Sequence, residues 1–293
     1  MLPRESLTAV RGRPYLLLLP ALAALGLFAA GFLTFVVVSF QTATPGTVLT
    51  HGPATLANYS SVLASPLVRG TALDTLRLAA LMTALTALLG YPLAYVMARS
   101  TSRLARRLVL FGLIVTFLSG GVTRAYAWLI ILGNRGLLNQ TLAALGLPTL
   151  RLAYNETGVV IGVVHFLLPF FVLTLLAALK NIPVSLEESA RNLGASRWRV
   201  FWHVVLPLSI PGLVSAASLS FAGALSAFLF PELLGGGRVH MASNVIFETI
   251  LTDFNLPRVA AMAALFLVLA LAALALLAAL ERASARLWAG GTR

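Results

Sequence analysis

Apolar residues follow one another along most of this chain, in runs longer than a strand or helix of a soluble domain uses. A helix needs about 20 consecutive, mostly apolar residues to cross the hydrocarbon core of a bilayer. Runs of this kind predict six membrane-spanning helices, at about residues 15–40, 71–98, 108–132, 158–179, 208–230 and 259–280. The pattern therefore predicts an all-α integral membrane protein, organised as a single transmembrane domain over residues 1–293.

Polar residues within these runs refine the picture. Asp74 and Arg77 begin the second run one helical turn apart, so they can pair near the headgroups. The fifth run is rich in serine and glycine, which favours close packing at the centre of a helix bundle. The first run is too long for the apolar part of a signal peptide, so we interpret it as a retained anchor.

Composition excludes a single soluble domain. The 293 residues are 59% hydrophobic and 10% charged, whereas a soluble domain carries roughly 25% charged residues. Disorder is excluded too, because it requires low hydrophobicity and high charge. The chain contains no cysteine, which excludes disulfides, thiolate metal sites and cysteine nucleophiles.

The basic residues indicate a topology rather than a nucleic-acid partner. The net charge is +12, but the arginines cluster in short segments between the apolar runs. Positive segments stay on the cytoplasmic side of a membrane, so the pattern predicts that both termini lie in the cytoplasm. The basic residues assigned to the cytoplasmic side are Arg4, Arg11, Arg13, Arg99, Arg103, Arg106, Arg107, Lys180, Arg191, Arg197, Arg199, Arg282, Arg286 and Arg293.

Motifs of catalysis and of cofactor or metal binding are missing. There is no phosphate-binding GxxxxGK[ST] loop, no HExxH motif and no GxSxG elbow. We therefore expect no catalytic residue, cofactor or metal in this chain. A membrane enzyme is a weaker alternative, because no acidic pair lies within a span. An ion-coupled carrier is another, but neither inverted repeats nor acids at the middle of the membrane are evident.

The longest cytoplasmic segment, residues 181–207, predicts two short amphipathic helices joined by a turn. Ser185 and Glu188 have the spacing of a capping box, and Gly194 can end the first helix with a positive φ. Ser196 can cap the second helix, which is expected to stop before a proline. Composition alone also allows an interfacial loop whose aromatic residues sit at the headgroups. We call this segment the elbow.

Six residues of the elbow stand at a distinctive spacing, namely Glu188, Ala190, Gly194, Val204, Leu206 and Pro207. This spacing resembles the EAA signature of ABC importer permeases, with Ser189 and Val204 standing where that signature has Ala and usually Ile. Further motifs resemble the spermidine/putrescine-type permease subunit, at residues 90–95, 124–128, 136–139, 168–169 and 230–237.

This resemblance implies a type I ABC importer permease fold in a bacterial inner membrane. Two permease subunits, the second of them a different chain, would form a pore within the membrane lipid. Separate cytoplasmic ATPase subunits would hydrolyse ATP and bind the elbow as a coupling helix, and an extracytoplasmic solute-binding protein would deliver the solute. The resemblance favours a polyamine, although another small organic or phosphonate-type solute stays open.

A possible substrate path follows the fifth run. Glu232 could attract an ammonium group, and Phe228 and Phe230 could stack on a cation. Alternatively Glu232 pairs with Arg238 or Arg258, and the two phenylalanines serve packing or gating.

Two further polar residues fall within predicted spans. Arg124, near the outer end of the third run, is interpreted as an interfacial anchor whose guanidinium reaches the headgroups. His165, in the fourth run, is interpreted as a packing residue rather than a proton relay.

Overall fold

The computed structural model describes residues 18–43 and 52–290, with side chains described up to residue 279 and at Arg282. The cluster of Arg4, Arg11 and Arg13 and the start of the first predicted span lie outside the described residues. The described residues are almost entirely helical, apart from an isolated bridge between Gln41 and Ala54. This confirms the all-α fold class.

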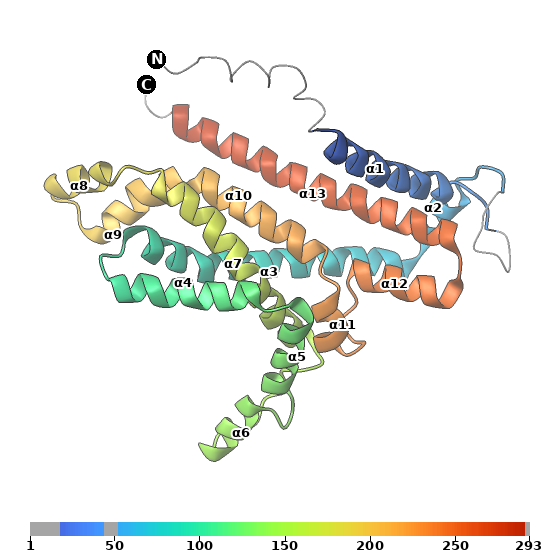
Figure 1. Ribbon diagram of the computed structural model, residues 1–293, viewed down its shortest axis with the longest axis horizontal. Coiled ribbons are helices and arrows are strands. Elements are labelled where there is room, and N and C mark those ends of the chain that lie inside the picture. The colour runs from blue at the N-terminus through green and yellow to red at the C-terminus, as the bar shows by residue number, and fades with distance from the viewer. Residues whose placement is uncertain (1–17, 44–51, 291–293) are drawn as a thin grey trace, which may run out of the picture. The chain divides into compact units, whose positions relative to one another are not determined.

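The helices are labelled in Figure 1. Their bounds are α1 (Leu19–Ser39), α2 (Ala57–Ala64), α3 (Pro66–Arg99), α4 (Arg103–Leu118), α5 (Gly121–Leu132), α6 (Leu137–Ala144), α7 (Glu156–Lys180), α8 (Val184–Asn192), α9 (Arg197–Val200), a π-helical segment (Phe201–Val205), α10 (Leu206–Leu225), α11 (Leu229–Gly235), α12 (Ala242–Asp253) and α13 (Leu256–Gly290).

Within the described residues, five helices are long and apolar enough to cross a membrane, or six spans if one bent pair counts as a span. The bent pair falls on the third predicted span, where Arg103–Leu118 and Gly121–Ala144 meet at 109°. The expected single helix over 108–132 is therefore broken. Gly120 is the N-cap of α5, with extended backbone between the two helices, and consecutive glycines are poor helix formers.

The chain divides into two compact units, which are described separately. Among the described residues, the first comprises 18–43, 52–64 and 249–265. Here Ser39 of α1 shares a 2.6 Å hydrogen bond with the hydroxyl of Tyr59 in α2. The side-chain amide of Asn58 donates to the backbone carbonyl of Ser39 at 2.9 Å. These bonds join the end of α1 to α2.

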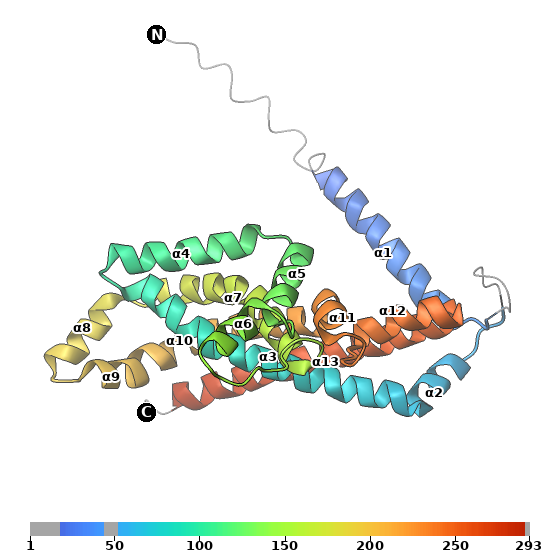
Figure 2. The same ribbon diagram turned by 90° about the horizontal axis from the view of Figure 1, so that it is seen from below.

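The second unit comprises the described residues 65–248 and 266–290 and contains the candidate site. Helix α7 lies at its centre, in contact with both α3 and α10 (Figures 1 and 2). Residues spaced by four along α7 form a fully buried stripe. They are Val159, Val163, Leu167, Phe171 and Leu175.

Small residues allow α7 to approach its neighbours closely. A Cβ atom placed on Gly90 of α3 would lie 2.5 Å from Cδ1 of Phe171. A Cβ atom on Gly212 of α10 would collide with the Cβ of Ala178. The serine and glycine content of the fifth run thus corresponds to a helix packed against the central one.

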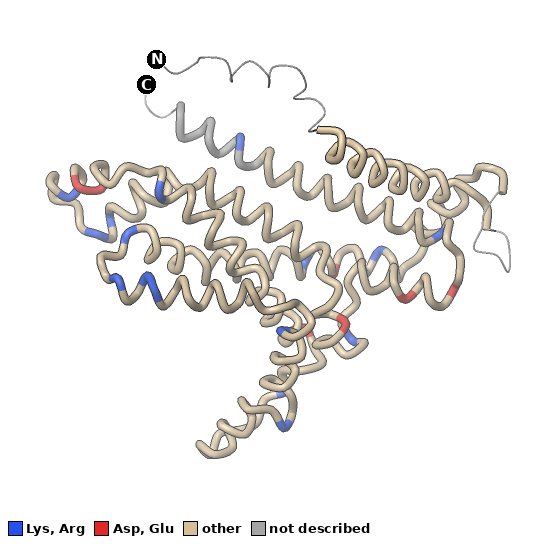
Figure 3. The backbone as a smooth tube through the Cα atoms, viewed as in Figure 1, with Lys and Arg blue, Asp and Glu red and all other residues tan. Residues whose placement is uncertain are grey.

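Charge is unevenly distributed along the second unit. Helices α3 and α7 both end at the elbow, and Figure 3 shows basic residues gathered where the elbow meets the start of α4. At the other end of α3 and α7, Arg77 forms ion pairs with Asp74 and with Glu156. This polarity is the one that the positive-inside rule requires; the cytoplasmic location of the termini stays a prediction.

Candidate functional site: the elbow and its attachment to the bundle

The first elbow helix ends in a glycine turn. Gly194 has φ +86°, and its N–H donates to the carbonyl of Arg191 at 2.9 Å. The N–H of Ala195 donates to the carbonyl of Ala190 at 3.0 Å. These two bonds form a Schellman motif, which requires a residue of left-handed conformation four positions after Ala190. The spacing of Ala190 and Gly194 therefore has a backbone cause.

The predicted capping box at the start of this helix is wrong. The N-cap residue is Pro183, without a side-chain cap, so Ser185 lies inside α8. The reason is that proline fixes φ near −65° and is compatible with the entry into a helix. The predicted cap of the second helix is confirmed, because Ser196 Oγ accepts a hydrogen bond from the N–H of Arg199 at 3.3 Å.

The second elbow helix was expected to stop before Pro207, but it continues through that residue. It passes through the π-helical segment into α10, so residues Arg197–Leu225 form one helical stretch of 29 residues. Pro207 follows the π-helical segment directly, and within a continuous helical stretch it leaves one backbone carbonyl of the preceding turn without its N–H partner. Val204 and Leu206 are half-buried at this junction, next to the fully buried Val205.

A buried ion pair attaches the elbow to α3. Arg99 Nε donates to Glu187 Oε1 at 2.5 Å, and Arg99 Nη2 donates to the carbonyl of Ile182 at 2.8 Å. The side chains of Arg99 and Glu187 are only 10% and 3% exposed. The neighbouring Glu188, which the sequence motif singles out, is exposed. Sequence reasoning missed Glu187, since two adjacent glutamates offer no signal as to which one faces α3.

Aromatic rings form a second attachment. The ring of Phe201 makes edge-on contacts with Tyr91 and Tyr95 of α3, both at 5.6 Å between centroids. Trp198 stacks on Phe201 at 5.9 Å. The hydroxyl of Tyr91 shares a 2.8 Å hydrogen bond with Ser209 Oγ of α10. The elbow is therefore held by α3 on two sides of its turn.

Large apolar side chains of the elbow remain exposed in this chain. Leu193 is 89% exposed and Trp198 is 70% exposed. The others are Val184, Leu186 and Trp202. A rigid projection with an uncovered apolar surface is typical of a protein–protein contact.

The three residues of the predicted substrate path have different surroundings in the structure. Phe230 is buried and packs against Phe166 at 5.7 Å between centroids. Phe228 is half-buried and contacts Phe247 at 5.1 Å. Glu232 is exposed, and its carboxylate accepts a 2.8 Å hydrogen bond from the side-chain amide of Asn244. Within the described chain, Glu232 forms no ion pair with an arginine, and Arg258 pairs with Asp253 instead.

Arg124 is not an anchor at the headgroups. It is 5% exposed, and its guanidinium donates to the carbonyls of Thr116 and Ser119 at the end of α4. It thus satisfies backbone acceptors that the break between α4 and α5 leaves without a helical partner. His165 has the packing environment that the sequence suggested, since Nδ1 accepts a 3.1 Å hydrogen bond from the indole N–H of Trp128.

Comparisons with known proteins agree with this architecture. A solved bacterial ABC transporter involved in the import of the acidic polysaccharide alginate matches with a TM-score of 0.74 and 20% identity, over 92% of this chain and 94% of that one. This likeness supports the type I importer fold that the sequence resemblance implied.

Sequence relatives agree as well. The spermidine/putrescine transport system permease protein PotB of Haemophilus influenzae is 33% identical over 207 residues, which are 70% of this chain and 72% of the relative. The molybdenum transport system permease protein ModB of Mycobacterium bovis is 32% identical over 211 residues, 71% of this chain and 77% of the relative. A family model matches residues 87–286, and this chain therefore belongs to the family of binding-protein-dependent transport system inner membrane components.

Proposed function

We propose that this chain is a pore subunit of an ATP-driven importer and that its elbow receives force from separate ATPase subunits. The observation that carries the proposal is the elbow itself. It is stiff, exposes apolar side chains, continues directly into α10 and is fixed to α3 by a buried ion pair. A displacement of the elbow therefore moves at least two spans together.

The six motif residues have distinct parts in this coupling. Ala190 and Gly194 form the turn that sets the direction of α8, and exposed Glu188 is available to a partner. Val204, Leu206 and Pro207 join the elbow to the membrane helix. Closure of the ATPase dimer on ATP would draw two elbows together and switch access to the pore. ATP would drive this change because it binds one of the two conformational states more tightly than the other.

The remaining partners follow from the same assignment. A second permease subunit, a different chain, completes the pore, and an extracytoplasmic solute-binding protein delivers the solute. Both termini then lie in the cytoplasm, with the elbow, and the start of α7 lies outside.

The proposed solute is a polyamine, on the strength of the relationship to PotB. Exposed Glu232 would attract the ammonium group and half-buried Phe228 would contact the cation, while Phe230 holds α11 against the core. Because ModB is a permease of a molybdenum transport system, an anionic solute should be tested alongside the polyamine.

The coupling role is tested by Gly194→Val with Gly146→Val as the matched control. Both glycines have positive φ, +86° and +71°, and neither has an atom within 4 Å of a Cβ placed on it. The strain of roughly 1–2 kcal/mol is therefore the same in both variants. We expect Gly194→Val alone to abolish ATP-driven uptake in proteoliposomes that contain the assembled importer. Normal uptake by Gly194→Val in a correctly assembled complex would refute the coupling role.

The solute is tested by uptake of radiolabelled spermidine, putrescine and molybdate in the same proteoliposomes. We expect uptake of a polyamine and at least a tenfold higher KM in Glu232→Gln. Uptake of molybdate alone would refute the polyamine assignment and leave the coupling role intact.

A further inference from the structure

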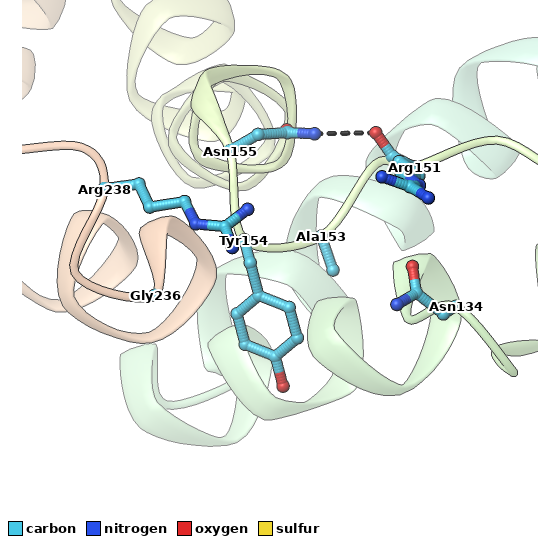
Figure 4. A pocket seen from close by; sticks show the side chains of 7 residues that line it. All are labelled: Asn134, Arg151, Ala153, Tyr154, Asn155, Gly236 and Arg238. Atoms are coloured by element: carbon cyan, nitrogen blue, oxygen red, sulfur yellow. Dashed lines mark hydrogen bonds between the residues drawn. The ribbon is translucent and has the colours of Figure 1, made fainter.

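A cavity of about 370 Å³ lies at the end of α7 that is remote from the elbow. Three segments that are distant in sequence line it, as Figure 4 shows. They contribute Asn134, Arg151, Ala153, Tyr154, Asn155, Gly236 and Arg238. None of these residues belongs to the elbow or to the proposed path beside Glu232.

The lining is basic. Arg151 and Arg238 are exposed at the cavity, and in the described part of the chain neither guanidinium forms an ion pair. No carboxylate lines the cavity. Two carboxylates line an adjacent cavity of about 210 Å³, which shares Arg238. These are Asp74 and Glu156, both already paired with Arg77.

The backbone of the cavity is tightly fixed. Tyr154 has φ +60°, a conformation that a non-glycine residue keeps only when its surroundings enforce it. Gly236 has φ +56°, and a Cβ atom on it would lie 2.5 Å from Cδ1 of Tyr154. The side-chain amide of Asn155 donates to the carbonyl of Arg151 at 2.6 Å, and its oxygen accepts from the N–H of Gly158 at 3.1 Å. The two arginines thus project from a preformed wall.

We propose that this cavity is a docking site for an acidic side chain of the extracytoplasmic solute-binding protein. The inference rests on the proposed function and on the orientation that it implies, which places the start of α7 outside the cell. Guanidinium groups bind carboxylates with two parallel hydrogen bonds, and Asn134 and Asn155 add neutral partners. Two unpaired guanidiniums repel an ammonium group, so the cavity does not hold the polyamine itself.

The test uses the assembled importer in nanodiscs and the purified solute-binding protein. The variants are Arg151→Glu, Arg238→Glu and the double change, with Arg135→Glu as the matched control. Arg135 is exposed and lies one residue from the lining Asn134, but it does not line the cavity. The readouts are the Kd of the binding protein, the basal ATPase rate without it, and the KM for solute at saturating binding protein.

We expect each single reversal to raise the Kd at least tenfold and the double reversal to raise it further. Arg135→Glu should stay within threefold of the wild type. The basal ATPase rate and the KM for solute should not change. An acid-to-arginine change on the binding protein that restores affinity for Arg238→Glu would identify the docked carboxylate.

Three results would overturn the inference: an unchanged Kd in the double variant, an equal loss in Arg135→Glu, or a changed KM for solute with an unchanged Kd. The last result would mean that the cavity contacts an anionic solute rather than the binding protein. Failure of the proposed function shows up separately, because the wild-type complex would then bind no solute-binding protein at all.

Discussion

Removal of one partner of the Arg99–Glu187 pair should release the elbow from α3. The informative changes are Arg99→Gln, Glu187→Gln and the double variant, because glutamine has the size of glutamate and retains hydrogen-bonding groups. Each single change leaves one charge without a counter-ion where the side chains are only 10% and 3% exposed. The adjacent Glu188→Gln is the matched control, since Glu188 is exposed.

The magnitude follows from this burial. Two unit charges about 4 Å apart interact by about 4 kcal/mol at an effective dielectric constant of 20. Breaking a buried pair by removing one partner costs about 3–5 kcal/mol, whereas removing both charges is often close to neutral. Each single variant should therefore destabilise the docked elbow by about 3 kcal/mol or more, and the double variant should recover most of that loss.

The assay is amide hydrogen exchange of residues 183–193, together with the number of solutes imported per ATP hydrolysed. Single variants should lose protection in the elbow and import fewer solutes per ATP, and Glu188→Gln should keep its protection. Additive losses in the double variant would contradict the reasoning, because independent residues show no coupling in a double-mutant cycle.

Two smaller changes test the packing of the second unit. Gly90→Ala places a methyl group 2.5 Å from the ring of Phe171, so the melting temperature should fall with an overpacking cost of about 1–3 kcal/mol; Gly70→Ala, in open space on the same helix, should be neutral or stabilising. Asn139 is 3% exposed and makes three hydrogen bonds to backbone groups. Asn139→Ala should therefore lower the stability of this segment by about 1–3 kcal/mol and increase the rate of proteolytic cleavage in the segment that follows residue 133. Gln140→Ala, which changes an exposed neighbour, should leave the cleavage rate unaltered.

Hydropathy was sufficient to predict the helical class, because long apolar runs act locally. Of the two caps predicted for the elbow, Ser196 is confirmed and Ser185 is wrong. Gly194 could be assigned from sequence, since its positive φ belongs to a turn of six residues. The break in the third span was not foreseen, although Gly120 and Gly121 mark it, because the apolar run continues across them.

Features that depend on packing between helices could not be predicted. Adjacent residues of a helix point about 100° apart, so the choice between Glu187 and Glu188 depends on where α3 lies. The burial of Arg124 is similar, because the carbonyl groups that it binds become available only after α4 has ended. The basic cavity combines residues 134, 151 and 238, which no local pattern connects.

The helical stretch from the elbow into α10 has one compliant section. The π-helical segment, Pro207 and Pro211 all fall within residues 201–211, and each removes or distorts regular backbone hydrogen bonds. Beyond it, Gly212 lies in close contact with Ala178 of α7. Bending should therefore concentrate in this short length, so that α10 keeps its shape against α7 while the elbow, which is fixed to α3, transmits its displacement to both spans.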